Sequence, residues 1–188
     1  MKILILEGIA TSGTSTITDR IREQLVGLSV RVATEEETHI PIMKQTNELH
    51  ITFFEDLIKR LVEEKPKLII FDRLYLTQAF RAGVSLEEYS DLENLLSKYD
   101  ILTVFLKVDD GAVTERVTRA VEHREPAWGE YIKTKGKTTS EIADYYISQQ
   151  RNQIDLLNTS NLPHIVFDTT NHDYKKITQQ ILEKIQLQ

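Results

Sequence analysis

The sequence predicts an α/β protein in which helices cover both faces of a parallel β-sheet. Two observations predict this fold class. Short apolar runs rich in β-branched and aromatic residues alternate along the chain with segments of helical periodicity. In addition, the first apolar run leads directly into a glycine-containing loop that a helix follows. In such doubly wound folds ligands bind at the carboxyl ends of the strands, so we expect a site at that edge of the sheet.

Five segments have the composition of buried strands in a parallel sheet. Their β-branched and aromatic residues form nearly continuous apolar runs, as expected for strands that helices cover on both sides. These segments are Ile3–Leu6, Val30–Thr34, Leu68–Phe71, Ile101–Val108 and Ile165–Phe167. The sequence contains no internal repeat and no linker, so we expect residues 1–188 to form one domain.

The segments between these runs have the spacing of amphipathic helices. After the first strand, apolar residues recur at helical spacing over 17–27, and a glycine at the end of this segment predicts the helix terminus. Between the second and third strands, the apolar positions of 49–62 predict a longer helix. Ser85 and Glu88 have the spacing of a capping box and predict the start of a helix that continues through Leu96.

The loop after the first strand has the glycine spacing of a phosphate-binding loop. Gly8 and Gly13 fit the pattern G-x-x-x-x-G-K-[ST], with Ser15 at the hydroxyl position and Thr14 where the lysine is expected. Glycines let backbone N–H groups converge on one concavity at the start of a helix, which makes an anion site. The missing lysine removes the ammonium that neutralises charge on the β- and γ-phosphates. The loop therefore predicts phosphate binding, with Ser15 as a ligand of Mg2+, more directly than it predicts catalysis.

A second candidate site is the pair Asp72 and Arg73, which follows the third predicted strand. A carboxylate there can hold Mg2+ or its water, and the planar guanidinium beside it can bind a phosphate or a polar substrate. The alternative for each motif is structural: an ion pair at the end of a strand, and an ordinary turn for the glycine loop. The strand before the loop and the helix after it favour the phosphate site, which in turn favours a functional Asp72 and Arg73.

Composition and charge exclude several classes of protein. The chain has 23 basic and 29 acidic residues and a formal net charge of -6, which argues against a general binder of nucleic acids or anionic membranes. No apolar run approaches the roughly 18 residues of a membrane span, and Glu7 and Gly8 interrupt any signal-like segment. We therefore expect a cytoplasmic protein without a membrane partner. The absence of cysteine excludes disulfides and thiol chemistry, and the five histidines lack metal-ligand spacing, which predicts surface or structural roles.

Four stretches of the chain together resemble the thymidylate kinases and deoxynucleoside kinases. EGIATSGTST resembles the E-G-x-x-G-x-G-K-S-T start of these enzymes, and DRLYLTQAF resembles the D-R-x-x-x-S-x-x-A stretch of the thymidylate kinases. YDILTVFLKVDD followed by TERVTRA is similar to the strand and helix that lead to their arginine-bearing lid. VFDTTNHD is similar to their C-terminal strand and adenine-side loop. The resemblance implies a P-loop nucleoside or nucleotide kinase fold, with a five-stranded parallel sheet flanked by helices and a lid segment at about 116–139.

The resemblance also implies cofactors, a substrate class and site residues. ATP and Mg2+ are the implied cofactors, and the implied partner is a small-molecule pyrimidine nucleotide or nucleoside. Ser15 and Asp72 are the implied metal ligands. The implied phosphate cradle consists of Gly8, Ala10, Thr11, Ser12, Gly13, Thr14, Ser15 and Thr16. The implied catalytic residues are Asp72, Arg73 and the lid arginines Arg116, Arg119 and Arg124.

Three features of the charged segments leave alternatives open. Arg116 and Arg119 stand one helical turn apart, so both can face one phosphate group and are candidates to clamp it. One of the glutamates at 35–37 is a candidate general base, and a solvated acidic turn is the alternative. A lysine of the segment 131–137 is a candidate replacement for the cation that Thr14 lacks, and a solvated basic loop is the alternative.

The function that these features predict is ATP-dependent phosphorylation of a nucleoside monophosphate or nucleoside, with a dTMP-type acceptor favoured. The alternative is a non-catalytic nucleotide-binding module derived from such a kinase, which Thr14 favours; the retained acidic and arginine side chains favour the enzyme. Trp128, Tyr145, Tyr146 and Gln149 are expected to pack rather than to contact an acceptor. The sequence leaves open which acceptor is used and whether the chain forms a homodimer through its apolar helices.

Overall fold

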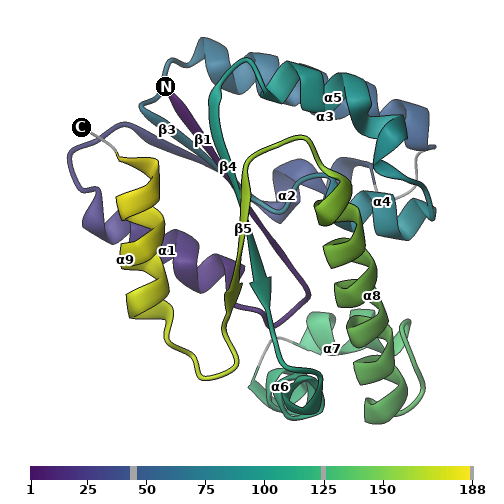
Figure 1. Cartoon of the computed structure of the whole chain (residues 1–188). Helices are drawn as coiled ribbons and strands as arrows, with labels where there is room; N and C mark the ends of the chain where they lie inside the picture. The colour runs from purple at the N-terminus through teal and green to yellow at the C-terminus, as the bar shows by residue number, and fades with distance from the viewer. Residues whose placement is uncertain (43–45, 124–125, 187–188) are drawn as a thin grey trace.

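A computed structural model describes residues 1–42, 46–123 and 126–186 and confirms the predicted α/β class (Figure 1). The sheet has five strands, all parallel, in the order β2-β3-β1-β4-β5. The strands are β1 (Lys2–Gly8), β2 (Val30–Ala33), β3 (Leu68–Asp72), β4 (Asp100–Lys107) and β5 (His164–Asp168). All five predicted strands are therefore present, and their ends lie within two residues of the prediction.

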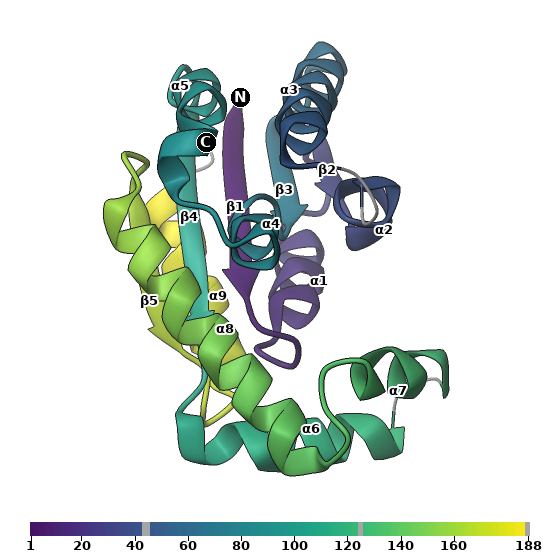
Figure 2. The ribbon, with the colours of Figure 1, turned by 90° about the vertical axis from the view of Figure 1, so that its right-hand side faces the viewer.

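Helices connect the strands and cover both faces of the sheet. They are α1 (Thr14–Gln24), α2 (Glu35–Thr38), α3 (Asn47–Glu63), α4 (Leu76–Ala82), α5 (Ser90–Leu96), α6 (Asp110–His123), α7 (Pro126–Lys133), α8 (Thr139–Thr159) and α9 (Tyr174–Ile185). Helices α1 and α9 lie on one side of the sheet, and α3, α5 and α8 lie on the other (Figures 1 and 2). Within the described residues, no helix has the length and apolarity that a membrane crossing needs.

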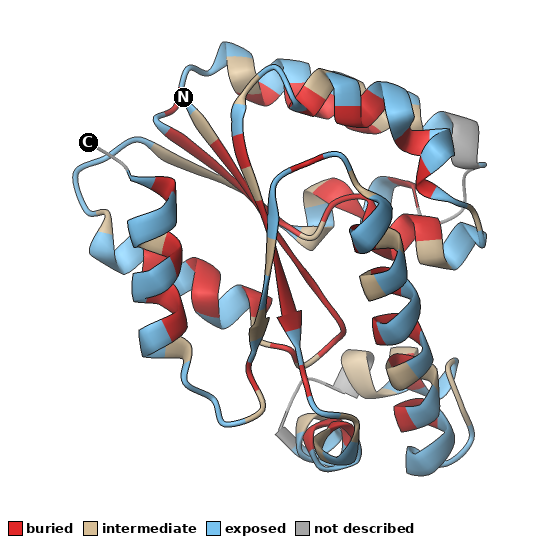
Figure 3. Cartoon of the chain, viewed as in Figure 1, coloured by how far each residue is buried: buried red, intermediate tan, exposed pale blue. Residues whose placement is uncertain are grey.

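The central strand β1 joins the cores on the two faces of the sheet. Because successive side chains of a strand point to opposite faces, Ile3 and Ile5 pack with α3, α4 and α5, whereas Leu4 and Leu6 pack with α1 and α9. Buried residues accordingly follow the strands and the inward faces of the helices (Figure 3). A third apolar cluster, which includes Ile9, lies beyond the carboxyl end of the sheet and holds α6, α7 and α8 against the glycine loop. This cluster fixes the lid helices beside the predicted site.

The helix predicted to begin at Ser85 starts differently. Ser85 makes no side-chain capping hydrogen bond, and the chain forms a 3-10 turn over Leu86–Tyr89 before α5 begins at Ser90. Leu86 and Tyr89 are both buried, and a 3-10 turn places residues three apart on the same side. The capping-box prediction is therefore wrong, because burial of these two side chains determines the turn.

Candidate active site

The loop between β1 and α1 has the backbone conformation of an anion-binding loop. Gly8, Thr11 and Gly13 have φ angles of 152°, 77° and 104°. A β-carbon on Gly8 would lie 2.5 Å from Ser12 Oγ and 2.7 Å from the Leu106 carbonyl oxygen, so the position requires glycine. Left-handed residues of this kind let successive N–H groups converge on one concavity, and α1 begins directly after the loop. The loop therefore has a backbone conformation suited to an anion.

Thr14, which replaces the expected lysine, is the first residue of α1 and is only 2% exposed. A buried hydroxyl brings no positive charge to the loop. The positive charge available to an anion at the loop would therefore come from the backbone N–H groups and from the partial positive charge at the N-terminus of α1.

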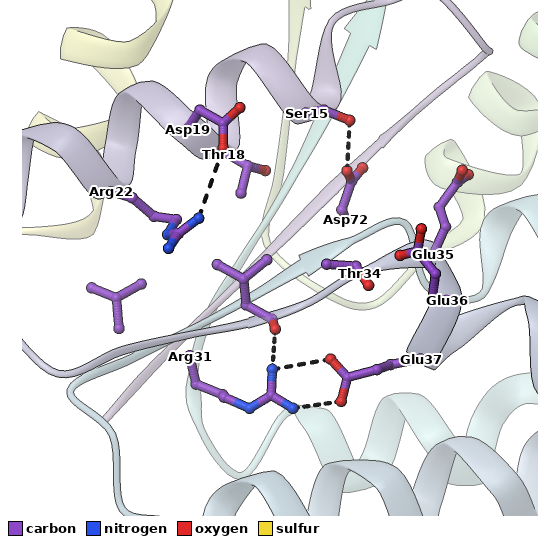
Figure 4. Close-up of a pocket in the computed structure, with 12 residues that line it drawn as sticks. Ser15, Thr18, Asp19, Arg22, Arg31, Thr34, Glu35, Glu36, Glu37 and Asp72 are labelled. Atoms are coloured by element: carbon purple, nitrogen blue, oxygen red, sulfur yellow. Dashed lines mark hydrogen bonds and ion pairs between the residues drawn. The ribbon is translucent and has the colours of Figure 1, made fainter. Parts of the chain in front are cut away.

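The structure brings Ser15 and Asp72 together (Figure 4). Ser15 Oγ, in the first turn of α1, donates a hydrogen bond of 2.9 Å to Asp72 Oδ2 at the end of β3. Asp72 is buried, and its Oδ1 has no hydrogen-bond partner among the described residues. Mg2+ prefers hard oxygen ligands, and a buried carboxylate oxygen without a partner is costly unless a ligand binds it. The pair therefore fits a magnesium ion that completes its coordination with water and phosphate oxygens.

Arg73 and Glu35 form an ion pair at the carboxyl edge of the sheet. Arg73 has a left-handed φ of 66°, its N–H donates to the Leu6 carbonyl at 2.9 Å, and its side chain is 13% exposed. Glu35 is the first residue of α2, whereas Glu37, one half-turn later, accepts a hydrogen bond of 3.0 Å from Arg31 of β2. The acidic segment is thus a helical turn, and the fold gives two of its glutamates different arginine partners.

A cavity of about 250 Å³ lies beside this ion pair, and we call it the aromatic cavity. Its lining includes the aromatic residues Trp128, Tyr131, Tyr145 and Tyr146. Its polar lining includes Glu35, His39, Arg73, Arg81 and Gln149. The rings of Tyr145 and Tyr146 pack edge to face with centroids 5.4 Å apart. The aromatic residues that we expected to pack against the rest of the protein therefore also line a cavity.

Two cations border the aromatic cavity. Arg81 Nη2 donates to the Tyr131 hydroxyl at 3.0 Å, and Lys135 Nζ lies 4.9 Å from the Tyr131 ring centroid and 5.2 Å from that of Tyr145. Lys133 forms an ion pair within α7 instead. Lys135 thus contributes positive charge beside the aromatic wall, and its role as a substitute for the missing lysine stays a prediction.

A second cavity, of about 590 Å³, lies between α1, β2 and α2 (Figure 4). Ser15 and Asp72 line it, together with residues of α1 such as Asp19 and Arg22. Glu35 lines both cavities. The start of α2 therefore lies between the candidate metal ligands and the aromatic cavity.

The structure does not bring the predicted lid arginines together. Arg116 is buried at 7% exposure, and its guanidinium donates to the carbonyl oxygens of Thr11 (2.8 Å), Thr169 and Thr170 (3.3 Å). Arg119 is 63% exposed and pairs with Glu115 of its own helix. The two guanidinium groups therefore have different partners, and Arg116 ties the glycine loop to the segment after β5. Arg124 lies outside the described residues.

Sequence reasoning missed Glu7, the residue immediately before the glycine loop. Glu7 is fully buried, and its Oε1 accepts hydrogen bonds from the N–H groups of Leu74 (2.9 Å) and Leu76 (3.2 Å). Burial raises the pKa of Glu7 to about 7, although these hydrogen bonds and the charge of Arg73 act in the opposite direction. The available signal was a charged residue at the end of an otherwise apolar strand. Glu7 joins β1 to the turn that carries Arg73 and to the start of α4.

Several solved structures share this fold. A YorR protein from Bacillus subtilis, in complex with phosphorylated GDP, matches with a TM-score of 0.66 and 17% identity over 98% of this chain and 96% of that chain. Deoxyadenosine kinase from M. mycoides, with products dCMP and a flexible dCDP bound, matches with a TM-score of 0.57 and 20% identity over 99% of both chains. Shikimate kinase from Bacteroides thetaiotaomicron matches with a TM-score of 0.59 and 16% identity over 98% of both chains. No protein-family model and no curated protein matches the chain. At these identities the likeness shows the P-loop kinase fold.

Proposed function

We propose that the chain is an ATP-dependent kinase that transfers a phosphoryl group to a hydroxyl of a nucleoside. The observation that carries the proposal is the ion pair of Arg73 with Glu35, which lies between the Ser15 and Asp72 pair and the aromatic cavity. Phosphoryl transfer needs a donor site and an acceptor site that converge on one point. The carboxyl edge of this sheet has candidates for both.

On the donor side, we assign the phosphates of ATP to backbone N–H groups of the loop between β1 and α1, other than that of Ser12, which donates to the Ile9 carbonyl at 3.1 Å. Ser15 and Asp72 are the side chains suited to hold Mg2+ beside them, since one carboxylate oxygen is buried without a partner in the described chain. When bound, the ion neutralises charge on the β- and γ-phosphates. Because Thr14 supplies no cation, we expect the turnover to be slower than with a lysine at this position.

On the acceptor side, Glu35 favours a hydroxyl over a phosphate. The attacking oxygen forms a bond to the γ-phosphorus, the bond from that phosphorus to the β,γ-bridging oxygen breaks, and ADP leaves. A hydroxyl must also lose its proton, which the Glu35 carboxylate is suited to accept while Arg73 orients the carboxylate. A phosphate acceptor has no proton to lose and is repelled by a neighbouring carboxylate. The aromatic walls suit the flat ring of a base.

Two other functions have support from specific observations. Arg81 and Lys135 beside the aromatic cavity favour a nucleoside monophosphate acceptor of the dTMP type, because they bring positive charge. Thr14 in the phosphate loop favours a non-catalytic nucleotide-binding module.

A coupled assay with ATP and Mg2+, over the common deoxynucleosides and their monophosphates, separates these functions. We expect product from at least one nucleoside. Glu35→Gln should lower kcat by about 100-fold or more, because a positioned general base contributes roughly 10²–10⁴. Glu37→Gln, the matched control on Arg31, should keep the parental kcat. Product from monophosphates alone supports the second acceptor class, and ATP binding without any product supports the binding module.

A further inference from the structure

His39 is a buried histidine without a hydrogen-bond partner at the aromatic cavity. It is 3% exposed, and within the described chain neither Nδ1 nor Nε2 has a partner. Its backbone is fixed at the end of α2, where its N–H donates to the Glu35 carbonyl at 2.9 Å. Buried polar groups are nearly always paired in folded proteins, so two unpaired ring nitrogens call for an explanation.

The surroundings keep the His39 ring neutral. Burial, together with the positive charges of Arg81 and Arg73 and the nearby His50, holds the pKa of His39 well below its usual range. A neutral imidazole has one N–H donor and one nitrogen acceptor. His39 therefore offers a donor and an acceptor without charge, which suits a neutral polar ligand.

A second polar side chain, Gln149 of α8, lines the same cavity. Gln149 is 4% exposed, and its carboxamide has no hydrogen-bond partner in the part of the chain that the structure describes. The other buried glutamines of this helix have protein partners: Gln150 exchanges hydrogen bonds with the backbone of Val108, and the Nε2 of Gln153 donates to Thr77 at 2.9 Å, although the Oε1 of Gln153 has no partner among the described residues. On α8, the buried glutamine without a protein partner is thus the one that lines the cavity.

We propose that His39 is a specificity-determining residue that hydrogen-bonds to the base of a nucleoside acceptor, with Gln149 as a second contact. This inference rests on the proposed function. Tyr145 and Tyr146 offer surfaces on which any base can stack, and stacking alone discriminates weakly between bases. Hydrogen bonds to the polar edge of the ring provide the discrimination. Both ring nitrogens of His39 are enclosed, so the proposed contact requires cavity side chains to move when the base binds.

Three substitutions at two buried histidines distinguish a ligand contact from a structural role. His39→Phe keeps an aromatic ring and removes two unpaired polar atoms, so we expect an unchanged or higher Tm but nucleoside binding weakened by about 10-fold. His50→Phe is the matched control, because His50 is buried and its Nε2 lies 2.9 Å from the Ile42 carbonyl oxygen. It should lower the Tm and leave the nucleoside Kd unchanged. His39→Gln, which restores a donor and an acceptor, should recover part of the affinity.

The probes are thymidine, deoxycytidine, deoxyadenosine and deoxyguanosine, measured by isothermal titration calorimetry, and a ring-N-methylated analogue of the tightest binder. The parent should lose affinity for the methylated analogue, and His39→Phe should bind both forms alike. A parental Kd in His39→Phe for the tightest nucleoside would overturn the role of His39 and leave the kinase proposal intact. Failure of the parent chain to bind any of the four nucleosides would overturn both proposals.

Discussion

Replacing Glu7 by glutamine tests how the buried carboxyl group before the phosphate loop affects stability. Glu7 Oε1 accepts the N–H groups of Leu74 and Leu76, and Oε2 lies 3.4 Å from Thr77 Oγ1. A glutamine oxygen can accept the same two N–H groups, and its amide can donate to Thr77. Glu7→Gln therefore preserves the local geometry and removes only the titration.

The expected magnitude follows from the pKa of Glu7, which burial raises from 4.5 to about 7. The folded protein then holds a proton that the unfolded chain releases between these pH values. The contribution of Glu7 to the free energy of unfolding is therefore fully present below pH 4.5, and it is lost as the pH rises to about 7. At ~1.4 kcal/mol per pH unit, the loss is on the order of 3 kcal/mol. Glu7→Gln should lose none of it.

Urea denaturation followed by circular dichroism at pH 5, 6, 7 and 8 measures the difference in unfolding free energy between variant and parent. For Glu7→Gln this difference should shift in favour of the variant by about 2.5 kcal/mol between pH 5 and pH 8, because the first part of the loss occurs below pH 5. Glu37→Gln is the control, because Arg31 lowers the pKa of Glu37 and moves its titration below this range. A pH-independent difference for Glu7→Gln would refute the reasoning, since Glu7 would then stay ionised in the folded protein.

Four further substitutions test the loop and the lid. Thr14→Lys should raise kcat ~10-fold or more in the coupled assay, because a charged contact in a shielded site is worth roughly 1.5–3 kcal/mol, and an unchanged rate would contradict this. Thr11→Gly should raise the unfolding free energy by up to about 1 kcal/mol, because a left-handed φ of 77° strains threonine. A lower unfolding free energy of this variant, measured by urea denaturation, would count against the reasoning. Arg116→Met should lower the unfolding free energy by ~2–4 kcal/mol, because it leaves buried carbonyl groups unpaired. Arg119→Ala, at an exposed position, should change it by less than about 0.5 kcal/mol. Equal losses for the two variants would disprove the structural role of Arg116.

The sequence by itself determined the fold class, all five strands and the position of the candidate phosphate loop. These features depend on local patterns: β-branched runs form strands wherever helices bury them, and Gly8 and Gly13 are needed where the backbone takes left-handed or crowded conformations. The order of strand, loop and helix around the candidate phosphate loop is likewise encoded in neighbouring residues. The position of Asp72 and Arg73 could be predicted for the same reason, because residues at the end of a buried strand in a parallel sheet lie at its carboxyl edge.

Only the tertiary structure decided which charged and polar groups meet. Glu35 and Arg73 are 38 residues apart, and pairing of β2 with β3 brings them together while Glu37 turns to Arg31. Arg116 reaches the carbonyl of a residue 105 positions earlier because an apolar cluster packs α6 against the loop. Spacing on one helix cannot predict such contacts, because their geometry depends on how distant segments pack. The same holds for His39, whose unpaired ring nitrogens become apparent only once the chain has enclosed them.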